Sequence, residues 1–273
     1  MHFQIVQPSG FLKNFIKQYC FMESDASEGN VCERVIPTEN VQIMFHYKTP
    51  FVVYHPDNTI THQPQTIISG LTNSFSDVST FGDAGVIFVA FQPAGACHFF
   101  NFPLSEIENQ SIDLSDIFFK EIKQVEEKLY SKNTLAERVN LIESFLLKRF
   151  SQVPYYDESL IRTGVQLIKQ NKGQISALAL SDKLSVSSKS LERKFSEYLG
   201  KTPKQFIKLI RFQETLYDIS SNKNINLTEY AYRNGYFDQS HFIRDFKLFS
   251  GYTPKEFIAK YPDFNISPDS INC

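Results

Sequence analysis

The chain has 273 residues, of which 42% are hydrophobic and 21% are charged, a composition typical of soluble globular proteins. This length suffices for two domains that each bury a core. No apolar run approaches the roughly 20 residues that a membrane-spanning helix needs. The first residues also lack the basic and apolar segments of a signal peptide. We therefore expect a cytoplasmic protein that does not contact a membrane.

The formal net charge of −2 hides an uneven distribution of charge along the chain. Residues 160–262 carry 17 Lys and Arg against 9 Asp and Glu, whereas residues 1–159 carry 11 against 19. A basic C-terminal part joined to an acidic N-terminal part indicates that only the former meets a polyanion.

The first hundred residues predict a β-rich domain. Short runs of β-branched and aromatic residues, such as 41–47 and 86–91, alternate with turns that contain Pro, Gly or Asp-Asn. Strands at this spacing favour a barrel or sandwich over alternating strands and helices. The prediction is an α+β two-domain protein with a β-rich domain over residues 1–152, in which helices begin at about residue 104.

Two helices are predicted at the end of this domain. Apolar residues recur at helical spacing over 117–130 and 134–150, and Thr134 with Glu137 has the pattern of a capping box. The apolar face of helix 134–150 has two open uses: packing against the strands of its own domain, or pairing with the same helix of a second subunit in a homodimer. Pro154 breaks the helical pattern, so we place a linker at 153–158, a helical domain at 159–262 and a tail at 263–273.

The helical domain contains a repeat with an offset of 51 residues. Seven residues recur: Arg193, Phe195, Gly200, Thr202, Pro203, Phe206 and Ile207 return as Arg244, Phe246, Gly251, Thr253, Pro254, Phe257 and Ile258. A repeat of this kind indicates a duplicated structural unit. Each unit has the pattern of a short helix, a tight turn and a second helix.

The helix ends of the two units have recognisable signals. N-caps are predicted at Ser176, Ser187, Thr202, Asn226, Asp238 and Thr253. Gly200 and Gly251 suit the left-handed position that ends a helix, and Pro203 and Pro254 suit the first position of the next one. A long helix from Pro203 to about Ser220 then separates the units.

Residues 161–258 resemble the C-terminal DNA-binding domain of the AraC/XylS family of bacterial transcription regulators. The second unit follows the family signature almost throughout, including Gly235-Tyr-Phe-Asp-Gln-Ser-His-Phe242, whereas the first departs from it at Ser181 and Ser185. More weakly, residues 36–46 and 89–107 are similar to the sensor domain of many members, a cupin-like β-barrel followed by helices. The resemblance implies a sequence-specific DNA-binding transcription regulator with an N-terminal domain that binds an effector or mediates dimerisation.

The second helix of a helix-turn-helix unit presents its exposed face to base edges. Leu191, Phe195, Phe242 and Phe246 are expected on the inward faces. The resemblance places the following outward residues at positions that contact bases: Lys189, Glu192, Arg193, Gln239, Ser240, Ile243 and Arg244. Two alternatives stay open. Arg193 and Arg244 could instead contact phosphate or a nearby carboxylate, and Glu192 could be an ordinary surface residue.

Phosphate contacts are expected from helix N-termini and from polar side chains near them. The predicted residues are Ser187, Lys201, Thr202, Asn226, His241, Lys247, Tyr252 and Thr253. The long helix between the units would hold the two reading helices about one DNA turn apart, roughly 34 Å.

The sequence predicts no metal site, no cofactor and no enzyme activity. The histidines lack the spacing of metal ligands, the four cysteines form no CxxC pair, and no nucleotide-binding glycine motif is present. The expected partners are double-stranded DNA, a small-molecule effector, and RNA polymerase if the protein activates transcription. Two alternatives are a regulator whose ligand-free N-terminal domain is controlled by protein contacts, and a metal-binding cupin enzyme fused to a DNA-binding domain.

Overall fold

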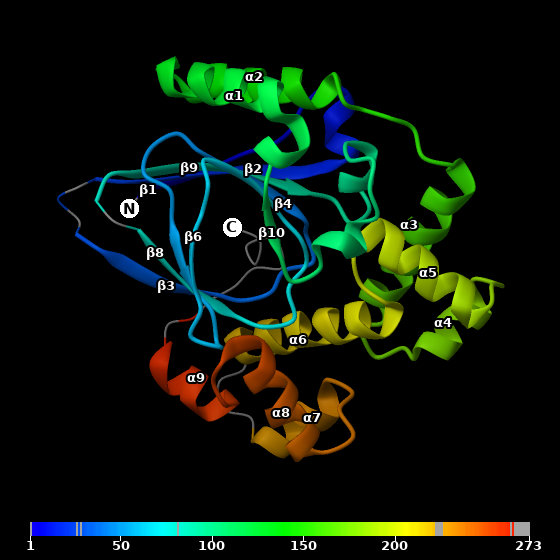
Figure 1. The fold of residues 1–273 in the computed structure, drawn as a ribbon. Coiled ribbons are helices and arrows are strands. Elements are labelled where there is room, and N and C mark those ends of the chain that lie inside the picture. The colour runs from blue at the N-terminus through cyan, green and yellow to red at the C-terminus, as the bar shows by residue number, and fades with distance from the viewer. Residues whose placement is uncertain are drawn as a thin grey trace.

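The structure is a computed structural model that describes residues 2–25, 27, 29–80, 82–221, 226–262 and 264. Its N-terminal part is built from strands and its C-terminal part from helices (Figure 1). The strands are β1 (His2–Val6), β2 (Ile16–Ser24), β3 (Val31–Val35), β4 (Gln42–His46), β5 (Val52–Tyr54), β6 (Ile60–His62), β7 (Thr66–Ser69), β8 (Ser76–Thr80), β9 (Ala84–Phe91) and β10 (Ser111–Asp113). The predicted α+β two-domain fold is confirmed.

The strands form two antiparallel sheets rather than one closed barrel. A six-stranded sheet has the order β1-β2-β9-β4-β7-β10, and a four-stranded sheet has the order β3-β8-β5-β6. Among the described strands no pairing joins one sheet to the other, so the predicted barrel does not close. Short 3-10 helices lie between strands at Gly10–Asn14, Ala96–His98 and Leu104–Ile107, the last of which is η4.

Alternate residues of the central strands face two different layers. On β9, Ile87 and Val89 belong to the large core under the helices, whereas Val86 belongs to a smaller cluster with Met22 and Phe51 between the sheets. Because side chains alternate along a strand, a strand buried on both faces reads as a continuous apolar run. This explains the unbroken apolar run at 86–91.

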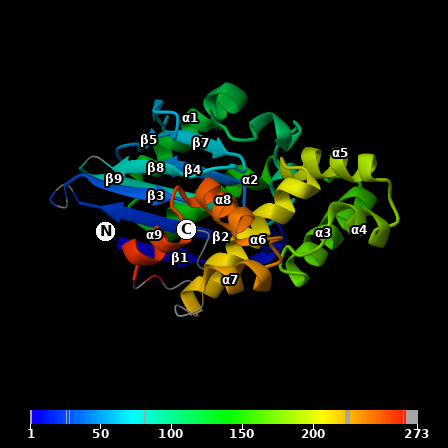
Figure 2. The ribbon, with the colours of Figure 1, turned by 90° about the horizontal axis from the view of Figure 1, so that it is seen from below.

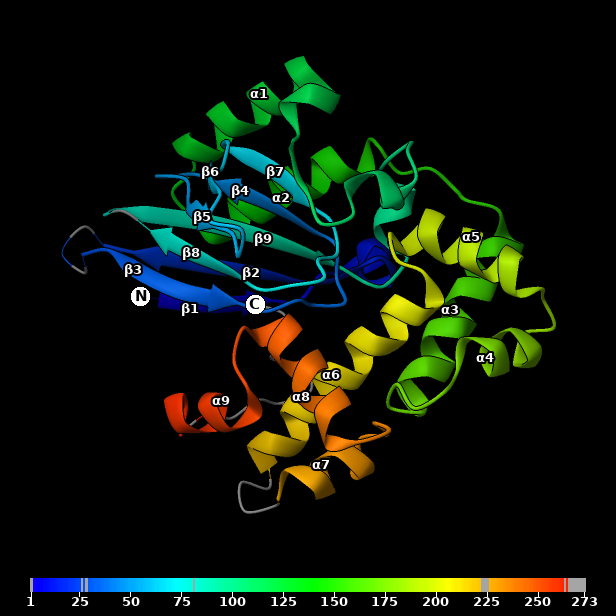
Figure 3. The same ribbon diagram turned by 60° about the horizontal axis from the view of Figure 1, so that its bottom comes forward.

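Helices α1 (Ser115–Ser131) and α2 (Leu135–Leu147) cover one face of the six-stranded sheet (Figures 1 and 3). The capping box of Thr134 and Glu137 is present at the start of α2. Phe145 packs edge-on against Phe45 of β4 with ring centroids 6.4 Å apart, and Tyr19 of β2 donates a hydrogen bond to Glu143 at 3.0 Å. The apolar face that could have paired two subunits is therefore used within the chain.

The C-terminal helices are α3 (Tyr155–Gln170), α4 (Ala177–Lys183), α5 (Ser188–Leu199), α6 (Pro203–Ser221), α7 (Leu227–Arg233), α8 (Gln239–Ser250) and α9 (Pro254–Lys260). Helix α3 begins at Tyr155, inside the segment predicted as a linker. The predicted tail, 263–273, lies outside the described residues apart from Phe264. None of the helices in the described ranges is both long enough and apolar enough to cross a bilayer.

Helix α6 separates two groups of helices, with α3 to α5 at one end and α7 to α9 at the other (Figure 2). The core of the first group is continuous with the core of the N-terminal domain, since one buried cluster contains Phe45, Leu104, Phe195 and Phe206. The second group has a separate core that includes Phe212, Tyr230, Phe242, Phe246 and Phe257.

Candidate nucleic-acid interface

The two repeated units, α4–α5 and α7–α8, have the same kinds of helix cap and helix end. Side chains of Ser187 and Asp238 accept hydrogen bonds from the backbone N–H groups of Ser190 and His241, which caps α5 and α8. Both helices end at a glycine in the left-handed region, Gly200 with φ of 75° and Gly251 with φ of 77°. The predicted repeat is thus present in the backbone as well as in the sequence.

The inward faces of α5 and α8 are buried. Leu191, Phe195, Phe242 and Phe246 are at most 1% exposed. Phe195 packs against Phe206 of α6 with ring centroids 6.3 Å apart. These contacts fix the rotation of each helix about its axis, and hence determine which side chains face outward.

The residues expected to read bases lie on the remaining faces. Lys189, Glu192, Arg193, Ser240 and Arg244 are exposed. Gln239 and Ile243 are half-buried, and Gln239 accepts a hydrogen bond from Thr228 of α7 at 3.0 Å. Within the described part of the chain, neither Arg193 nor Arg244 forms an ion pair.

Most residues expected to contact phosphate lie at the surface. Ser187, Asn226 and Lys247 are exposed, and Thr202 and Thr253 are half-buried N-caps of α6 and α9. His241 is only partly available, because its Nε2 lies 3.3 Å from Asp245 and its ring packs edge-on against Tyr236.

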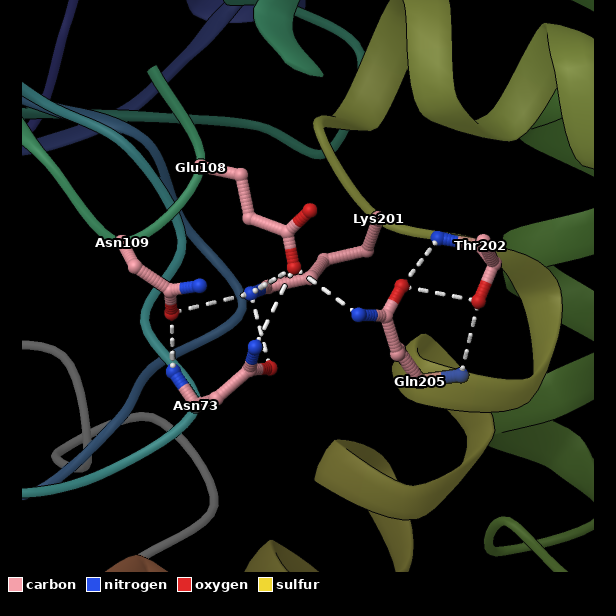
Figure 4. A network of polar contacts seen from close by, with 6 residues as sticks. All are labelled: Asn73, Glu108, Asn109, Lys201, Thr202 and Gln205. Atoms are coloured by element: carbon pink, nitrogen blue, oxygen red, sulfur yellow. Dashed lines mark hydrogen bonds and ion pairs between the residues drawn. The ribbon is translucent and has the colours of Figure 1, made fainter. Parts of the chain in front are cut away.

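Lys201 does not lie at the DNA-facing surface that the sequence predicts for it. Its side chain is 2% exposed, and its Nζ donates hydrogen bonds to Glu108 and Asn73 of the N-terminal domain, each at 2.8 Å (Figure 4). Burial lowers the pKa of Lys201 even though Glu108 opposes that effect. In this arrangement the ammonium group is paired with a carboxylate of its own chain, so it cannot contact a phosphate.

Glu108 is the centre of this network. Its Oε1 accepts hydrogen bonds from Lys201 at 2.8 Å, from Gln205 at 2.8 Å and from Asn73 at 3.2 Å (Figure 4). Burial alone would raise the pKa of Glu108, but these donors outweigh it and hold the pKa below its usual value. Glu108 therefore stays charged and joins the N-terminal domain to the start of α6.

Tyr252, which occupies the position equivalent to Lys201 in the repeat, also contacts the N-terminal domain. The guanidinium carbon of Arg34 lies 4.4 Å from the centre of its ring. Its hydroxyl accepts a hydrogen bond from Lys260 at 2.6 Å. The aromatic face of Tyr252 is consequently occupied, whereas the residue as a whole remains half-exposed.

One exposed side chain beside the reading face is not predicted from the sequence. Phe237 is 85% exposed and directly precedes Asp238, the N-cap of α8. The sequence feature that could have indicated this exposure is the position of Phe237 between a buried aromatic residue, Tyr236, and a helix N-cap. A phenyl ring at this position can contact a thymine methyl group.

Residues 180–260 match the helix-turn-helix domain family HTH_18. The C-terminal domain is an AraC-type helix-turn-helix domain. This class of domain belongs to DNA-binding transcription regulators. Residues 4–113 match a domain of unknown function, DUF6597.

The individual proteins that this chain resembles are distant from it in sequence. Histidine kinase P4 of Formosa agariphila is 26% identical over 143 residues, which are 50% of this chain and 10% of the kinase, so the chain is similar to a small part of that protein. ToxT of Vibrio cholerae is 12% identical and aligns over 89% of this chain and 97% of its own, with a TM-score of 0.46. The C-terminal domain of AraT, a response regulator of Geobacillus stearothermophilus, is 22% identical over 43% of this chain and 93% of its own, with a TM-score of 0.36.

The described residues offer no grouping of three His, Cys, Asp or Glu side chains that could hold a metal ion. His46 instead packs against Phe51 and hydrogen-bonds to Gln63, and His98 stacks on Phe150. These two histidines therefore have contacts within the N-terminal domain.

Proposed function

We propose that the protein is a cytoplasmic, sequence-specific transcription regulator that reads two neighbouring segments of double-stranded DNA with α5 and α8. The observation that carries the proposal is the pair of exposed helix faces on α5 and α8, in the two groups of helices that α6 separates (Figure 2). With 19 residues, α6 is about 28 Å long, close to the roughly 34 Å of one DNA turn. Two helices so separated suit successive segments of the major groove.

The exposed side chains have the chemistry of base recognition. Arg193 and Arg244 can each bond two acceptors of guanine, Gln239 suits adenine, and Ile243 can touch a thymine methyl. Since neither arginine has an ion-pair partner among the described residues, both guanidinium groups are available. Each good pair discriminates between bases by about 1–3 kcal/mol.

Phosphate contacts would orient the helices on the duplex. The exposed Lys247 and the N-terminus of α5 at Ser187 are the best placed of the predicted groups, since they flank the reading faces. Such contacts carry little sequence information but supply much of the affinity, which therefore falls with added salt.

The N-terminal domain would control DNA binding in response to an effector or a partner protein. If the protein activates transcription, it would contact RNA polymerase while bound to DNA. Met22, Phe51, Ala84 and Val86 pack together in this domain. A homodimer would need a surface other than the buried face of α2.

The direct test is to select bound duplexes from a pool of random DNA with the full-length protein at two salt concentrations. The proposal predicts a motif of two short boxes whose centres lie about 10 base pairs apart. Arg162→Ala is the control for the loss of an arginine outside the reading helices, because Arg162 lies on α3 and pairs with Glu158. It should select the same motif. Salt-sensitive binding without any motif would contradict the proposal.

A further inference from the structure

The two reading helices end against the N-terminal domain at equivalent positions. A Cβ atom on Gly200 would lie 2.8 Å from the carbonyl oxygen of Leu104, and one on Gly251 would lie 2.6 Å from the ring of Phe75. Leu104 is in η4 and Phe75 directly precedes β8. Only glycine permits so close an approach of the backbone at both helix ends.

The first contact combines an ion pair with apolar packing. Lys201 directly follows Gly200, and its buried ion pair with Glu108 is part of the network in Figure 4. Leu199 at the end of α5 lies in the same buried cluster as Leu104 and Ile107 of η4. The first unit and the N-terminal domain thus share one core, and α5 is held by apolar packing as well as by charge.

The second contact is centred on Arg34. Arg34 of β3 forms a two-pronged ion pair with Asp77, in which both N···O distances are 2.7 Å. Its guanidinium carbon lies 4.0 Å from the centre of the Phe75 ring and 4.4 Å from that of Tyr252. Arg34 also donates a hydrogen bond to the carbonyl oxygen of Ser250, the last residue of α8, at 3.4 Å. A cation at this helix end is favourable for the helix dipole.

Residues that follow Arg34 in the chain also contact the helical domain. Ile36 packs against the core of the second unit. The carbonyl oxygen of Pro37 accepts a hydrogen bond from Gln213 of α6 at 3.5 Å, and Glu39 pairs with Lys169 of α3 at 2.6 Å. Segment 34–39 therefore bridges the second unit, the spacer helix and the first group of helices.

The two units differ in what holds them. Because the second unit has its own core, its position relative to the first depends on α6, on the contacts of segment 34–39, and on Gln174, which donates a hydrogen bond to the carbonyl oxygen of Arg233 at 3.0 Å. We propose that Arg34 and Glu108 are positioning residues that fix the distance and angle between α5 and α8, so that the N-terminal domain selects the spacing between the two DNA boxes. This proposal rests on the function proposed above.

The test compares the full-length wild type with Arg34→Gln on duplexes that carry the two selected boxes at five spacings, from two base pairs shorter than the selected spacing to two longer. Two base pairs turn a box by about 70° around the helix, so a rigid pair of helices cannot follow. The wild type should bind its best spacing at least about tenfold more tightly than the extreme ones, since losing one good base contact weakens binding by about that factor. Arg34→Gln should reduce that ratio to about threefold or less, because a mobile second unit keeps most of its base contacts. Glu108→Gln should act in the same direction.

Arg138→Gln is the matched control, because Arg138 also stacks on an aromatic ring, that of Tyr47 at 3.8 Å, but does so between α2 and the sheet. It should keep the wild-type spacing profile. An unchanged profile for Arg34→Gln, or a change in affinity that is equal at every spacing, would overturn the positioning role. A wild type that shows no preference for the boxes over random DNA would instead overturn the proposed function.

A second measurement needs no DNA. It detects a positioning role whichever bases α5 and α8 recognise. Spin labels at Ser188→Cys on α5 and Leu248→Cys on α8, in a chain whose exposed Cys32 is replaced by serine, report the distance between the reading helices. The same chain without the two introduced cysteines shows how much label the other thiols take up. Arg34→Gln should broaden the distance distribution, and Arg138→Gln should leave it unchanged. A distribution for Arg34→Gln as narrow as that of the wild type would contradict the proposal.

Discussion

At the scale of single residues, positions related by the repeat have matching environments. Phe195 and Phe246 are both fully buried, and Gly200 and Gly251 have φ values of 75° and 77°. The environments follow from residue type, because an inward aromatic and a left-handed glycine serve the same purpose in each unit. The pair Lys201 and Tyr252 differs in chemistry, yet both contact the N-terminal domain.

A pH dependence follows from one buried histidine. His46 of β4 is 2% exposed, and burial lowers its pKa to about 4 despite a hydrogen bond with Gln63. The unfolded chain binds a proton near pH 6.5, so the neutral folded form is fully favoured above that pH and loses stability as the pH falls towards 4. Urea unfolding at pH 7 and pH 4.5 should show a free-energy loss about 2 to 3 kcal/mol larger for the wild type than for His46→Gln.

The control for this measurement is His62→Gln, which replaces an exposed histidine of β6. It should keep the wild-type dependence on pH. If His46→Gln loses as much stability between the two pH values as the wild type does, burial of a neutral His46 is not the cause.

At the scale of elements, the ends of the helices are the features that the sequence predicts best. Every N-cap predicted by residue type, from Ser176 to Thr253, is found at the start of a helix, and the capping boxes at Thr134 and Thr253 are complete. Caps are local, since the side chain and the backbone group that it satisfies lie three residues apart. The burial of Lys201 was not predictable in this way, because Glu108 is 93 residues distant in the chain. For the same reason, the strand runs were recognisable but their division into two sheets was not.

The glycine at the end of α8 provides a test at this scale. Gly251→Ala should place a Cβ against Phe75 and Arg34 in addition to forcing alanine into the left-handed region. Gly10→Ala is the matched control, because Gly10 also has a positive φ, 57°, but nothing lies within 4 Å of the position that its Cβ would take. The control should lose about 1 kcal/mol of unfolding free energy, and Gly251→Ala about 1–3 kcal/mol more from crowding. Equal losses in urea unfolding would contradict the close approach of Arg34 and Phe75.

At the scale of the whole molecule, the cores do not follow the boundary between the two domains. The first helix-turn-helix unit shares its core with the N-terminal domain, whereas the second has a core of its own. Apolar burial is the main favourable contribution to folding, so residues in one core lose stability together. We expect the first unit to unfold with the N-terminal domain and the second unit to open more independently.

The equivalent residues Phe195 and Phe246 separate these two behaviours. Phe246→Leu should speed amide hydrogen exchange mainly in α7 to α9, because it weakens the core of the second unit alone. Phe195→Leu should also speed exchange around η4 and in the six-stranded sheet, since its core extends there. Each variant is the control for the other, because both replace a fully buried phenyl ring with a smaller side chain. Faster exchange throughout the sheet in Phe246→Leu would argue for a single cooperative core.

Tandem reading, in which α5 and α8 each recognise one box of a two-box site, is the hypothesis on which the other functional proposals depend. It is tested by measuring the affinity of Arg193→Ala and Arg244→Ala for the selected duplex and for every single base-pair change in it. Each variant should lose about 1–3 kcal/mol of discrimination at one or two base pairs, and the two sets of base pairs should lie in different boxes about one turn apart. If both variants weaken binding equally at every sequence, the arginines contact phosphate and tandem base reading is wrong.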